Sequence, residues 1–319
     1  METIIGKDLI VARQLLHAGE LVGIPTETVY GLAGNALNED AVLKIFKAKQ
    51  RPQFNPLIIH LPLWKDAEKY VLNIPAEANE LAMHFAPGPL TFLLPKKNIV
   101  PDLVTAGSNK VAIRIPAHPL TMQLLKNLDF PLAAPSANPF GYVSPTTAQH
   151  VYENLKDRIP YVLDGGPCTI GLESTIVDFE DGKVIIRRNG GISKELLEEV
   201  LGKNVEVATG AIEHPVAPGQ LKSHYATETP LYVGDINELI QQFTGKKIIH
   251  IGFGNSASTE GFNLSPSANL DEAAKNLFAL LRKADKMNAD VIITSLLPAE
   301  EIGRAINDRL LRARHEMKS

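Results

Sequence analysis

The stretch VAIRIPAHPLTMQLLKNLDFPLAAPSAN, residues 111–138, decides the fold class. It contains two short apolar runs, VAIRIP at 111–116 and LAAPSAN at 132–138, and both have the length and boundaries that are typical of buried strands. The segment at 118–127 between them has apolar residues at helical spacing. A strand, a helix and a second strand in so short a stretch predict an α/β fold in which helices pack against a sheet.

The same alternation continues on both sides of this stretch, from the amino terminus to about residue 200. The apolar runs are bounded by Pro, Gly or Asn. The later strands follow one another closely, which is not the order of a simple doubly wound fold. We therefore expect a mixed α/β sheet covered by helices. The further predicted strands lie at 21–25, 57–62, 91–95, 161–166, 174–179 and 183–188, and the further predicted helices lie at 8–18, 39–49, 64–70, 76–86 and 146–155.

The composition changes over residues 203–229, where Pro, Gly, Thr and Ala are common and no clear period is present. Long structureless segments of compact proteins are usually linkers or functional lids. Beyond this segment, strands and helices alternate in a pattern that predicts a small Rossmann-like parallel α/β domain. We therefore expect a main domain over residues 1–202, a linker or lid over 203–229, and an accessory domain over 230–319.

Composition also excludes several classes of protein. The chain has 32 Lys and Arg against 36 Asp and Glu, so no bulk positive field indicates nucleic-acid binding. Its single cysteine, Cys168, excludes a disulfide framework and a thiolate metal cluster. The amino terminus does not resemble a secretory signal and no apolar run could span a bilayer, so we expect a soluble, cytoplasmic protein. The P-loop motif and the H-E-x-x-H motif are both absent.

Two polar clusters lie in the first fifth of the chain. The segment IPTETVYGLAGNA at 24–36 is interpreted as a loop rich in hydroxyl groups and glycine, which is either a well-capped connection or a ligand-binding turn. Lys49 and Arg51 stand at the end of a helix, where they either complement the helix dipole or bind phosphate. Asn55 and His60 would then lie at the start and the end of the next strand.

Two further clusters follow. Arg114 lies within an apolar strand, where an unpaired guanidinium would be costly, so it needs an anionic partner, either a structural Asp or a ligand carboxylate. Ser136 and Asn138 follow a strand, where α/β folds tend to bind ligands, although both residues also suit a simple turn. Ser174 follows a glycine-rich turn that contains Cys168, which we interpret as unreactive because nothing nearby in the sequence would activate its thiol.

Taken together, these clusters resemble the YrdC-like threonylcarbamoyl-AMP synthases, in the long form that carries an extra carboxyl-terminal domain. The resemblance follows nearly the whole chain in order, which makes it far more specific than any single motif. The runs that carry it are PTETVYGL (25–32), Lys49-x-Arg51 followed by NPLIIH (55–60), FAPGPLTFLL (85–94), AIRIPAHP (112–119), APSAN (134–138) with SPT (144–146), ESTIVD (173–178), IIRRNG (185–190), PVAPGQLKSHYA (215–226) and AINDRLLRA (305–313).

The resemblance implies a twisted mixed sheet around a large concave cavity. It implies an enzyme that joins L-threonine, bicarbonate and ATP, releases diphosphate and forms threonylcarbamoyl-AMP. A tRNA threonylcarbamoyl-transferase system would then use this product to modify an adenosine beside the anticodon. The resemblance assigns catalysis to Lys49 and Arg51, threonine binding to Thr28, His60, Arg114, Ala134 and Ser174, and ATP binding to Arg51, Asn55, Lys110, Ser136, Asn138, Ser144, Arg188 and Tyr225.

The mechanism that we expect needs no protein nucleophile. The threonine amine captures CO₂ or bicarbonate, and the resulting carbamate attacks the α-phosphorus of ATP, so that alignment and cationic side chains carry the catalysis. Mg²⁺ is expected on the nucleotide phosphates, with no ligands from protein side chains. In the linker, Lys222, His224 and Tyr225 either fold over the cavity as a lid or belong to an ordinary tether.

Two other functions compete with this one. An RNA-binding or ribosome-maturation factor would use a basic cavity for a phosphate backbone. The net acidity and the lack of an RNA-binding signature count against it, and at most weak RNA binding is expected. A carbamoyl-adenylate enzyme that uses carbamoyl phosphate is built on a related domain, but its zinc-finger segment would require cysteines that this chain lacks.

Overall fold

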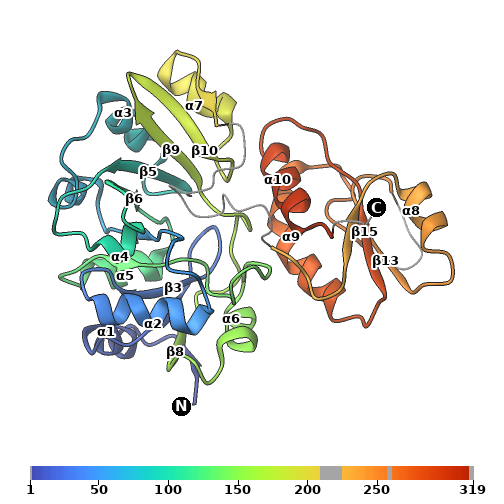
Figure 1. The fold of residues 1–319 in the computed structure, drawn as a ribbon, viewed down its shortest axis with the longest axis horizontal. Coiled ribbons are helices and arrows are strands. Elements are labelled where there is room, and N and C mark those ends of the chain that lie inside the picture. The colour runs from blue at the N-terminus through green and yellow to red at the C-terminus, as the bar shows by residue number, and fades with distance from the viewer. Residues whose placement is uncertain (1, 209–224, 257–260, 316–319) are drawn as a thin grey trace.

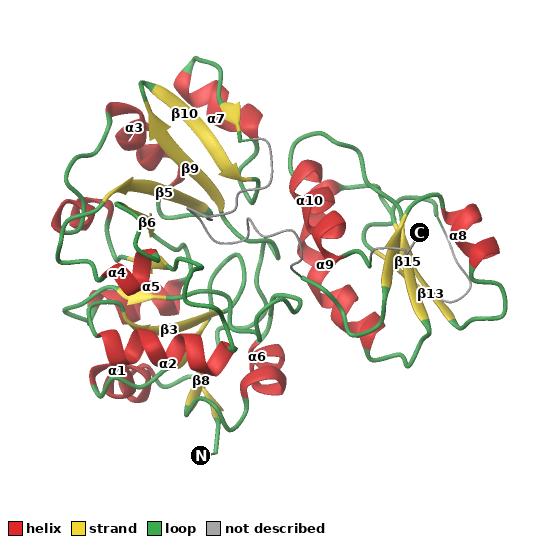
Figure 2. Ribbon diagram, in the orientation of Figure 1, coloured by secondary structure: helices red, strands yellow, loops and turns green. Residues whose placement is uncertain are grey.

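Two β-sheets organise the chain (Figure 1, Figure 2). The computed structural model describes residues 2–208, 225–256 and 261–315. The strands of the first sheet lie between residues 4 and 207, in what we call the large unit (residues 2–208), and those of the second lie between residues 231 and 294, in the small unit (residues 231–315). In the described chain, no helix is long and apolar enough to cross a membrane.

The large sheet is mixed, as the sequence predicts, and its described strands follow the order β1-β8-β2-β3-β7-β4-β6-β5-β9-β10-β11. β4 pairs in parallel with β6, whereas β5 runs antiparallel to β6 and in parallel with β9. The strands are β1 (Ile4–Gly6), β2 (Val22–Ile24), β3 (Gly31–Asn35), β4 (Ile58–His60), β5 (Leu90–Pro95), β6 (Lys110–Arg114), β7 (Leu132–Ala133), β8 (Tyr161–Leu163), β9 (Thr175–Glu180), β10 (Lys183–Arg188) and β11 (Glu206–Val207).

Some helices of the large unit begin at polar caps, and the helices bury apolar residues against the sheet. Asp8 caps α1 and Asn38 caps α2, each by accepting hydrogen bonds from backbone N–H groups of the first turn. Buried residues of α2, such as Ile45, join the main core cluster together with Phe92 and Ile113 of the sheet. The helices are α1 (Leu9–His17), α2 (Glu39–Lys49), the 3₁₀ helix η1 (Trp64–Lys69), α3 (Ala76–Phe85), α4 (Asp102–Thr105), α5 (Pro119–Lys126), α6 (Ala148–Leu155) and α7 (Lys194–Leu201).

The carboxyl end of α2 turns the chain toward the sheet. Gln50 caps the helix in the left-handed conformation, with φ of 52°, and the next residue is Arg51. A left-handed residue at a helix end stops the helix and reverses the chain direction. The turn therefore carries Arg51 off the helix axis and toward the segment that precedes β4, where the Asn55 and Pro56 carbonyls accept its hydrogen bonds.

Beyond short elements that the sequence did not predict, such as β1, α4 and α7, the structure corrects the expected loop at 24–36 and the expected domain boundary. The segment at 24–36 is not a loop throughout, because β3 occupies its second half and pairs with β2 and β7. In addition, β11 lies beyond the boundary expected at residue 202, and it extends the large sheet through parallel pairing with β10. Gly31 and Gly34 have low strand propensity, so pairing with neighbours on both sides overrides the local preference here.

The small unit has a parallel sheet in the order β12-β15-β13-β14, as the alternation of strands and helices predicts. Helices α9 and α10 lie on the side of this sheet that faces the large unit, and α8 lies on the other side (Figure 1). One core cluster joins Leu277 and Phe278 of α9 to Val29 and Val143 of the large unit. The elements are β12 (Leu231–Val233), α8 (Ile236–Gln242), β13 (Ile248–Gly252), β14 (Gly261–Asn263), α9 (Leu270–Asp285), β15 (Val291–Thr294) and α10 (Gly303–Ala313).

Candidate active site

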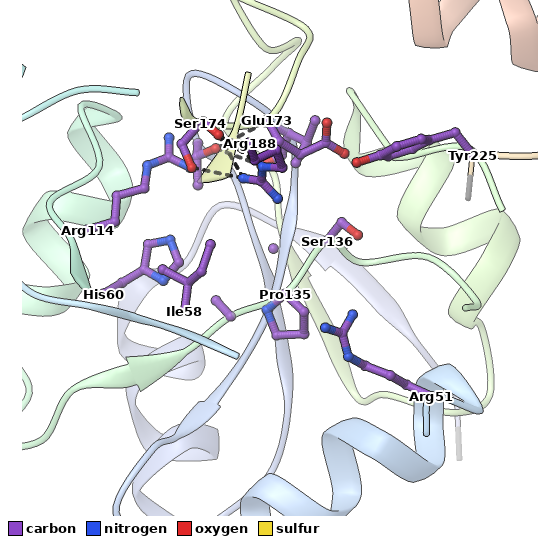
Figure 3. A pocket seen from close by; sticks show the side chains of 14 residues that line it. Arg51, Ile58, His60, Arg114, Pro135, Ser136, Glu173, Ser174, Arg188 and Tyr225 are labelled. Atoms are coloured by element: carbon purple, nitrogen blue, oxygen red, sulfur yellow. Dashed lines mark hydrogen bonds between the residues drawn. The ribbon is translucent and has the colours of Figure 1, made fainter. Parts of the chain in front are cut away.

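A cavity opens on the large sheet, at the ends of several strands (Figure 3). With its open mouth it has a volume of about 560 Å³. Its walls come from β4, β6 and β10, from the segments that follow β2 and β7, and from the segment that precedes β9. The residues that line it are Thr26, Val29, Gly31, Arg51, Ile58, His60, Arg114, Ala134, Pro135, Ser136, Glu173, Ser174, Arg188 and Tyr225.

The cavity has two sides. His60 and Arg114 lie on one side, and Arg51 and Tyr225 lie on the other, with Ser136 between them (Figure 3). The sequence assigned His60 and Arg114 to threonine and the other three residues to ATP. The structure therefore brings residues of both expected groups into one cavity, and the groups meet where Arg188 Nη2 lies 3.1 Å from Ser174 Oγ.

Arg114 ends β6 and is buried. Its Nη2 lies 2.6 Å from Oε1 of Glu27, and the second carboxylate oxygen of Glu27 accepts a hydrogen bond from the Ala117 N–H at 3.0 Å. The anionic partner that Arg114 requires is therefore Glu27, a glutamate of the β2–β3 segment that the sequence analysis did not single out. The guanidinium has five N–H donors, so it can hold Glu27 and still offer donors to a ligand carboxylate.

His60 ends β4, directly opposite Arg114 in the parallel pairing of β4 with β6. Its side chain is buried, and its Nδ1 has no hydrogen-bond partner in the described chain. Burial, with the neighbouring charge of Arg114 as the second cause, lowers the pKa of His60 to about 3. His60 is therefore neutral, and a buried ring nitrogen without a partner marks a position where a ligand group would be accepted.

The other residues predicted to bind the substrate threonine are Ser174, Ala134 and Thr28. Ser174 Oγ hydrogen-bonds Thr91 Oγ1 at 2.7 Å on the lining. Ala134 also lines the cavity, but its N–H donates to the Ile58 carbonyl at 3.1 Å and is already used. Thr28 does not reach the lining; its hydroxyl lies 2.8 Å from that of Thr26, which does.

Arg51 carries the positive charge of the opposite side. It is buried, its Nη2 donates to the Pro56 carbonyl at 2.9 Å and its Nε donates to the Asn55 carbonyl at 3.3 Å. Within the described residues it forms no ion pair with a carboxylate. Burial lowers the pKa of Arg51 because its charge loses water without gaining a counter-ion. A buried cation that lacks a counter-ion favours binding of an anion.

Lys49 lies behind the lining rather than on it. Its Nζ donates to the backbone carbonyls of Ser136 and Asn138, so the Lys-x-Arg and Ser-x-Asn motifs are in direct contact. Burial, together with the positive charge of Arg51, holds the pKa of Lys49 well below its ordinary value. The structure thus shows Lys49 shaping the loop that presents Ser136, and its direct contact with phosphate stays a prediction.

Three further residues with predicted ATP contacts lie behind the lining. Asn55 is fully buried, and both polar atoms of its side chain lack partners among the described residues. Asn138 donates to the Tyr142 carbonyl at 2.7 Å, while its Oδ1 has no partner there. Ser144 donates to Glu173 Oε1 at 2.6 Å. Unpaired buried amides of this kind are costly unless a ligand or water completes them.

Of the remaining residues predicted to bind ATP, Arg188 and Tyr225 line the cavity and Lys110 lies outside its lining. Arg188 lines the cavity, and its Nη2 donates to the Ser174 carbonyl at 2.8 Å. Tyr225 also lines it and stacks on Phe278 of the small unit, with ring centroids 5.4 Å apart. Lys110 is instead ion-paired outside the lining, 2.6 Å from Asp178 and 2.8 Å from Glu180. Lys222 and His224 lie outside the described residues, so the proposed lid is represented only by Tyr225.

Comparisons with known proteins match both units of the chain to known families. Residues 14–190 match the Sua5–YciO–YrdC family, described under the heading of telomere recombination, and residues 192–314 match the family of threonylcarbamoyl-AMP synthase carboxyl-terminal domains. The chain is 40% identical to the threonylcarbamoyl-AMP synthase of Pyrococcus abyssi, over 95% of this chain and 93% of that protein. This chain belongs to the threonylcarbamoyl-AMP synthase family.

Two further similarities support this membership. The threonylcarbamoyl-AMP synthase of Bacillus subtilis is 40% identical, over 95% of this chain and 91% of that protein. The crystal structure of P. abyssi Sua5 complexed with L-threonine has a TM-score of 0.91 and 38% identity, and the match covers 98% of this chain and 97% of that chain. Escherichia coli YciO, at 19% identity and a TM-score of 0.53 over 59% of this chain, shows only that the fold of the large unit is shared.

Among the charged residues that line the cavity of this synthase, sequence reasoning missed Glu173. Its Oε2 lies 3.0 Å from Nε of Arg309, which belongs to α10 of the small unit. Although burial opposes it, the charges of Arg309 and Arg188 hold the pKa of Glu173 below its ordinary value. A glutamate directly before Ser174 in the run ESTIVD was the available signal, because a carboxylate beside a predicted ligand serine must itself face the cavity or a cation.

Proposed function

We propose that this protein condenses L-threonine, bicarbonate and ATP into threonylcarbamoyl-AMP and diphosphate, for threonylcarbamoyladenosine formation in tRNA. The observation that carries the proposal is the two-sided cavity. One side pairs Arg114 with the neutral His60, and the other presents the buried cation Arg51 with Tyr225 (Figure 3). An amino-acid carboxylate suits the first side and a nucleotide triphosphate suits the second.

On the threonine side, the substrate carboxylate binds the Arg114 guanidinium through charge-assisted hydrogen bonds. His60 offers its unpaired Nδ1 to the amino-acid group next to it. Ser174 and the carbonyl of Ala134 complete the polar wall, and Thr26 and Thr28 form the hydroxyl pair at its edge. The neutral state of His60 matters, because a second positive charge beside Arg114 would repel the protonated amine of free threonine.

On the nucleotide side, Arg51 and Arg188 bind the triphosphate. Lys49 fixes the loop that presents Ser136, and the unpaired amides of Asn55 and Asn138 are the groups that nucleotide binding would complete. Cationic donors that are already in place act at full strength in a cavity that excludes water, and they stabilise the charge that develops on the phosphoryl oxygens.

The reaction proceeds in two steps. The threonine amine adds to CO₂ and loses a proton, or reacts with bicarbonate with loss of water, and either route gives a carbamate. A carbamate oxygen then attacks the α-phosphorus, the bond to the bridging oxygen of the β-phosphate breaks, and diphosphate leaves. No enzyme nucleophile takes part. Cys168, the only thiol of the chain, is buried, and burial raises its pKa to about 12.

Mg²⁺ is proposed to enter with ATP, on the phosphate oxygens, as part of the substrate. The described residues contain no group of three or more His, Cys, Asp or Glu that could hold a metal ion. The carboxylates of Glu27 and Glu173 already accept two hydrogen bonds each. The product is proposed to pass to a tRNA threonylcarbamoyl-transferase system in the cytoplasm.

The test is an omission experiment with the full chain and radiolabelled bicarbonate. Labelled threonylcarbamoyl-AMP and diphosphate should form only when threonine, bicarbonate, ATP and Mg²⁺ are all present. When free valine is added to the assay in place of free threonine, no labelled product should form, although the protein stays folded. Diphosphate release without threonine, or salt-dependent RNA binding with no nucleotide turnover, would contradict the proposal.

A further inference from the structure

Arg309 crosses from the small unit into the wall of the cavity. It belongs to α10, which faces the large unit (Figure 1), and its side chain is completely buried. Its Nε lies 3.0 Å from Glu173 Oε2, its Nη2 donates to the Asn189 carbonyl at 2.9 Å, and its Nη1 lies 2.7 Å from Asp308 Oδ2. Two of these three partners belong to the large unit, so Arg309 is bound mainly by residues of the other unit.

Arg309 neutralises the Glu173 carboxylate, whose position is unfavourable for binding of a polyanion. Glu173 lines the cavity together with Arg188, on the wall that Figure 3 shows above Ser136 and Arg51. A carboxylate at this position repels a triphosphate unless a cation holds it. Arg309 supplies that cation from outside the cavity and leaves the lining cations for the ligand.

Arg309 also supports Tyr225. Its guanidinium carbon lies 5.2 Å from the centroid of the Tyr225 ring, in cation–π geometry, while the same ring stacks on Phe278 of α9. The small unit therefore contacts Glu173 through an ion pair and Tyr225 through its ring, and both of these residues line the cavity. Both lie on the part of the cavity that the nucleotide is expected to occupy.

We propose that Arg309 is a positioning residue for the nucleotide: it holds Glu173 toward Ser144 and away from Arg188. Without Arg309, the buried Glu173 carboxylate would attract Arg188, whose charge already acts on it. Arg188 would then leave the Ser174 carbonyl, and Glu173 would compete with phosphate for its guanidinium group. The small unit would thus act on ATP binding without touching ATP. This inference rests on the proposed function for its assignment of ATP to this side.

The experiment compares four variants by calorimetric titration with ATP and, separately, with threonine. They are Arg309→Met, Glu173→Gln, the double variant Arg309→Met/Glu173→Gln, and Lys286→Met. The last removes an exposed ion pair with Glu153 at the same interface, 2.6 Å long and away from the cavity lining, and serves as the matched control. A thermal unfolding midpoint is measured for each variant.

The expected pattern is selective. Arg309→Met should weaken ATP binding by about tenfold and threonine binding by less than about twofold, because only the charge pair beside the nucleotide changes. The double variant should recover ATP affinity to within about threefold of the unaltered protein, since the neutral amide no longer attracts Arg188. Lys286→Met should match the unaltered protein in both titrations.

Equal loss of ATP and threonine affinity in Arg309→Met, with no recovery in the double variant, would reduce Arg309 to a scaffold residue and overturn the inference. Should Arg309→Met fail to fold, Arg309→Lys keeps the charge and is expected to weaken ATP binding less than threefold; a larger selective loss there contradicts neutralisation as the cause. Because these readouts are affinities, absence of product in the unaltered protein would refute the proposed function and leave this inference separately testable.

Discussion

The two sides of the cavity balance their charges differently. On the threonine side, Arg114 is bound to Glu27 within the protein, 2.6 Å away. On the nucleotide side, Arg51 has only backbone carbonyls as partners among the described residues, and burial lowers its pKa. Both guanidinium groups are buried to a similar degree, so the difference lies in their counter-ions and not in their exposure.

The difference corresponds to the charges of the proposed substrates. Threonine is a zwitterion with no net charge, so a side that is already neutral as a whole can accept it without a large electrostatic change. ATP is a polyanion, and its side keeps a positive charge that is compensated only when the nucleotide binds. A buried cation without a counter-ion costs stability in the empty protein and strengthens binding of the anion that supplies one.

The largest expected effect comes from removing the uncompensated cation. Arg51→Ala should lower threonine-dependent diphosphate release by on the order of 100- to 1,000-fold, because the variant loses a donor that stabilises phosphoryl charge. The thermal midpoint of the ligand-free protein should fall little or rise, since a buried charge is removed. The measurements are a diphosphate assay and calorimetric unfolding.

Arg51→Lys is the matched control for this comparison. It keeps the positive charge and loses the two-pronged fork, so its activity should lie between those of the alanine variant and the unaltered protein. Undiminished activity in Arg51→Ala would show that the nucleotide side does not depend on this charge, and the contrast between the two sides would be lost.

An effect with the opposite change in stability is expected on the threonine side. Arg114→Met should abolish measurable threonine binding and also destabilise the fold by about 3–5 kcal/mol, because Glu27 is left as a buried carboxylate without its cation. Adding Glu27→Gln should restore most of the stability and none of the threonine affinity. Chemical unfolding and threonine titration measure the two effects separately, and a double variant that remains as unstable as the single one would count against the ion pair as the cause.

The sequence predicted the fold well where local signals agree. The predicted helix at 39–49 coincides with α2, because its apolar period and the Asn38 cap indicate the same boundaries. β3 was missed because Gly31, Ala33 and Gly34 give no local strand signal, and the strand exists only because β2 and β7 pair with it. The pairing with β7 joins residues about a hundred positions apart, which no local pattern contains.

The sequence predicted which residues belong to the site better than it predicted which of them face the cavity. Eight predicted residues line one cavity, but spacing along a helix end does not reveal that Lys49 points behind the loop while Arg51 faces the cavity. The contact between Glu173 and Arg309 could not be predicted either, because it joins residues 136 positions apart in two different units. The predicted residues that line the cavity are Arg51, His60, Arg114, Ala134, Ser136, Ser174, Arg188 and Tyr225.

The neutral state of His60 on the threonine side can be tested by measuring protein stability as a function of pH. The pKa of His60 is about 3 in the folded protein against an ordinary value of 6.5, so below pH 6.5 the unfolded chain takes up a proton that the folded protein refuses. The contribution of His60 to stability is therefore complete above pH 6.5 and declines as the pH falls toward 3. Between pH 7 and pH 5 the loss should amount to about 2 kcal/mol.

The variant His60→Gln should remove this part of the acid destabilisation, measured as the difference in unfolding free energy between pH 7 and pH 5. His17→Gln provides the control, because its side chain is exposed and lies on α1, outside the cavity lining. Other buried histidines contribute equally to each protein and cancel in the comparison. Equal pH dependence in His60→Gln and the unaltered protein would indicate that His60 can be charged in the folded state.

The smallest expected effect concerns the Tyr225 hydroxyl group, and it tests whether the two sides of the cavity bind their ligands independently. Burial raises the pKa of Tyr225 to about 12, so its hydroxyl stays protonated and can donate to the nucleotide. Tyr225→Phe keeps the stack on Phe278 and the contact with Arg309, and should weaken ATP binding by about fivefold, which corresponds to one hydrogen bond of about 1 kcal/mol. Tyr142→Phe, which removes a hydroxyl bonded to Asp285 outside the lining, should leave ATP affinity unchanged. Threonine affinity should not change in either variant, and a parallel loss of both ligands in Tyr225→Phe would mean that the two sides are one continuous site.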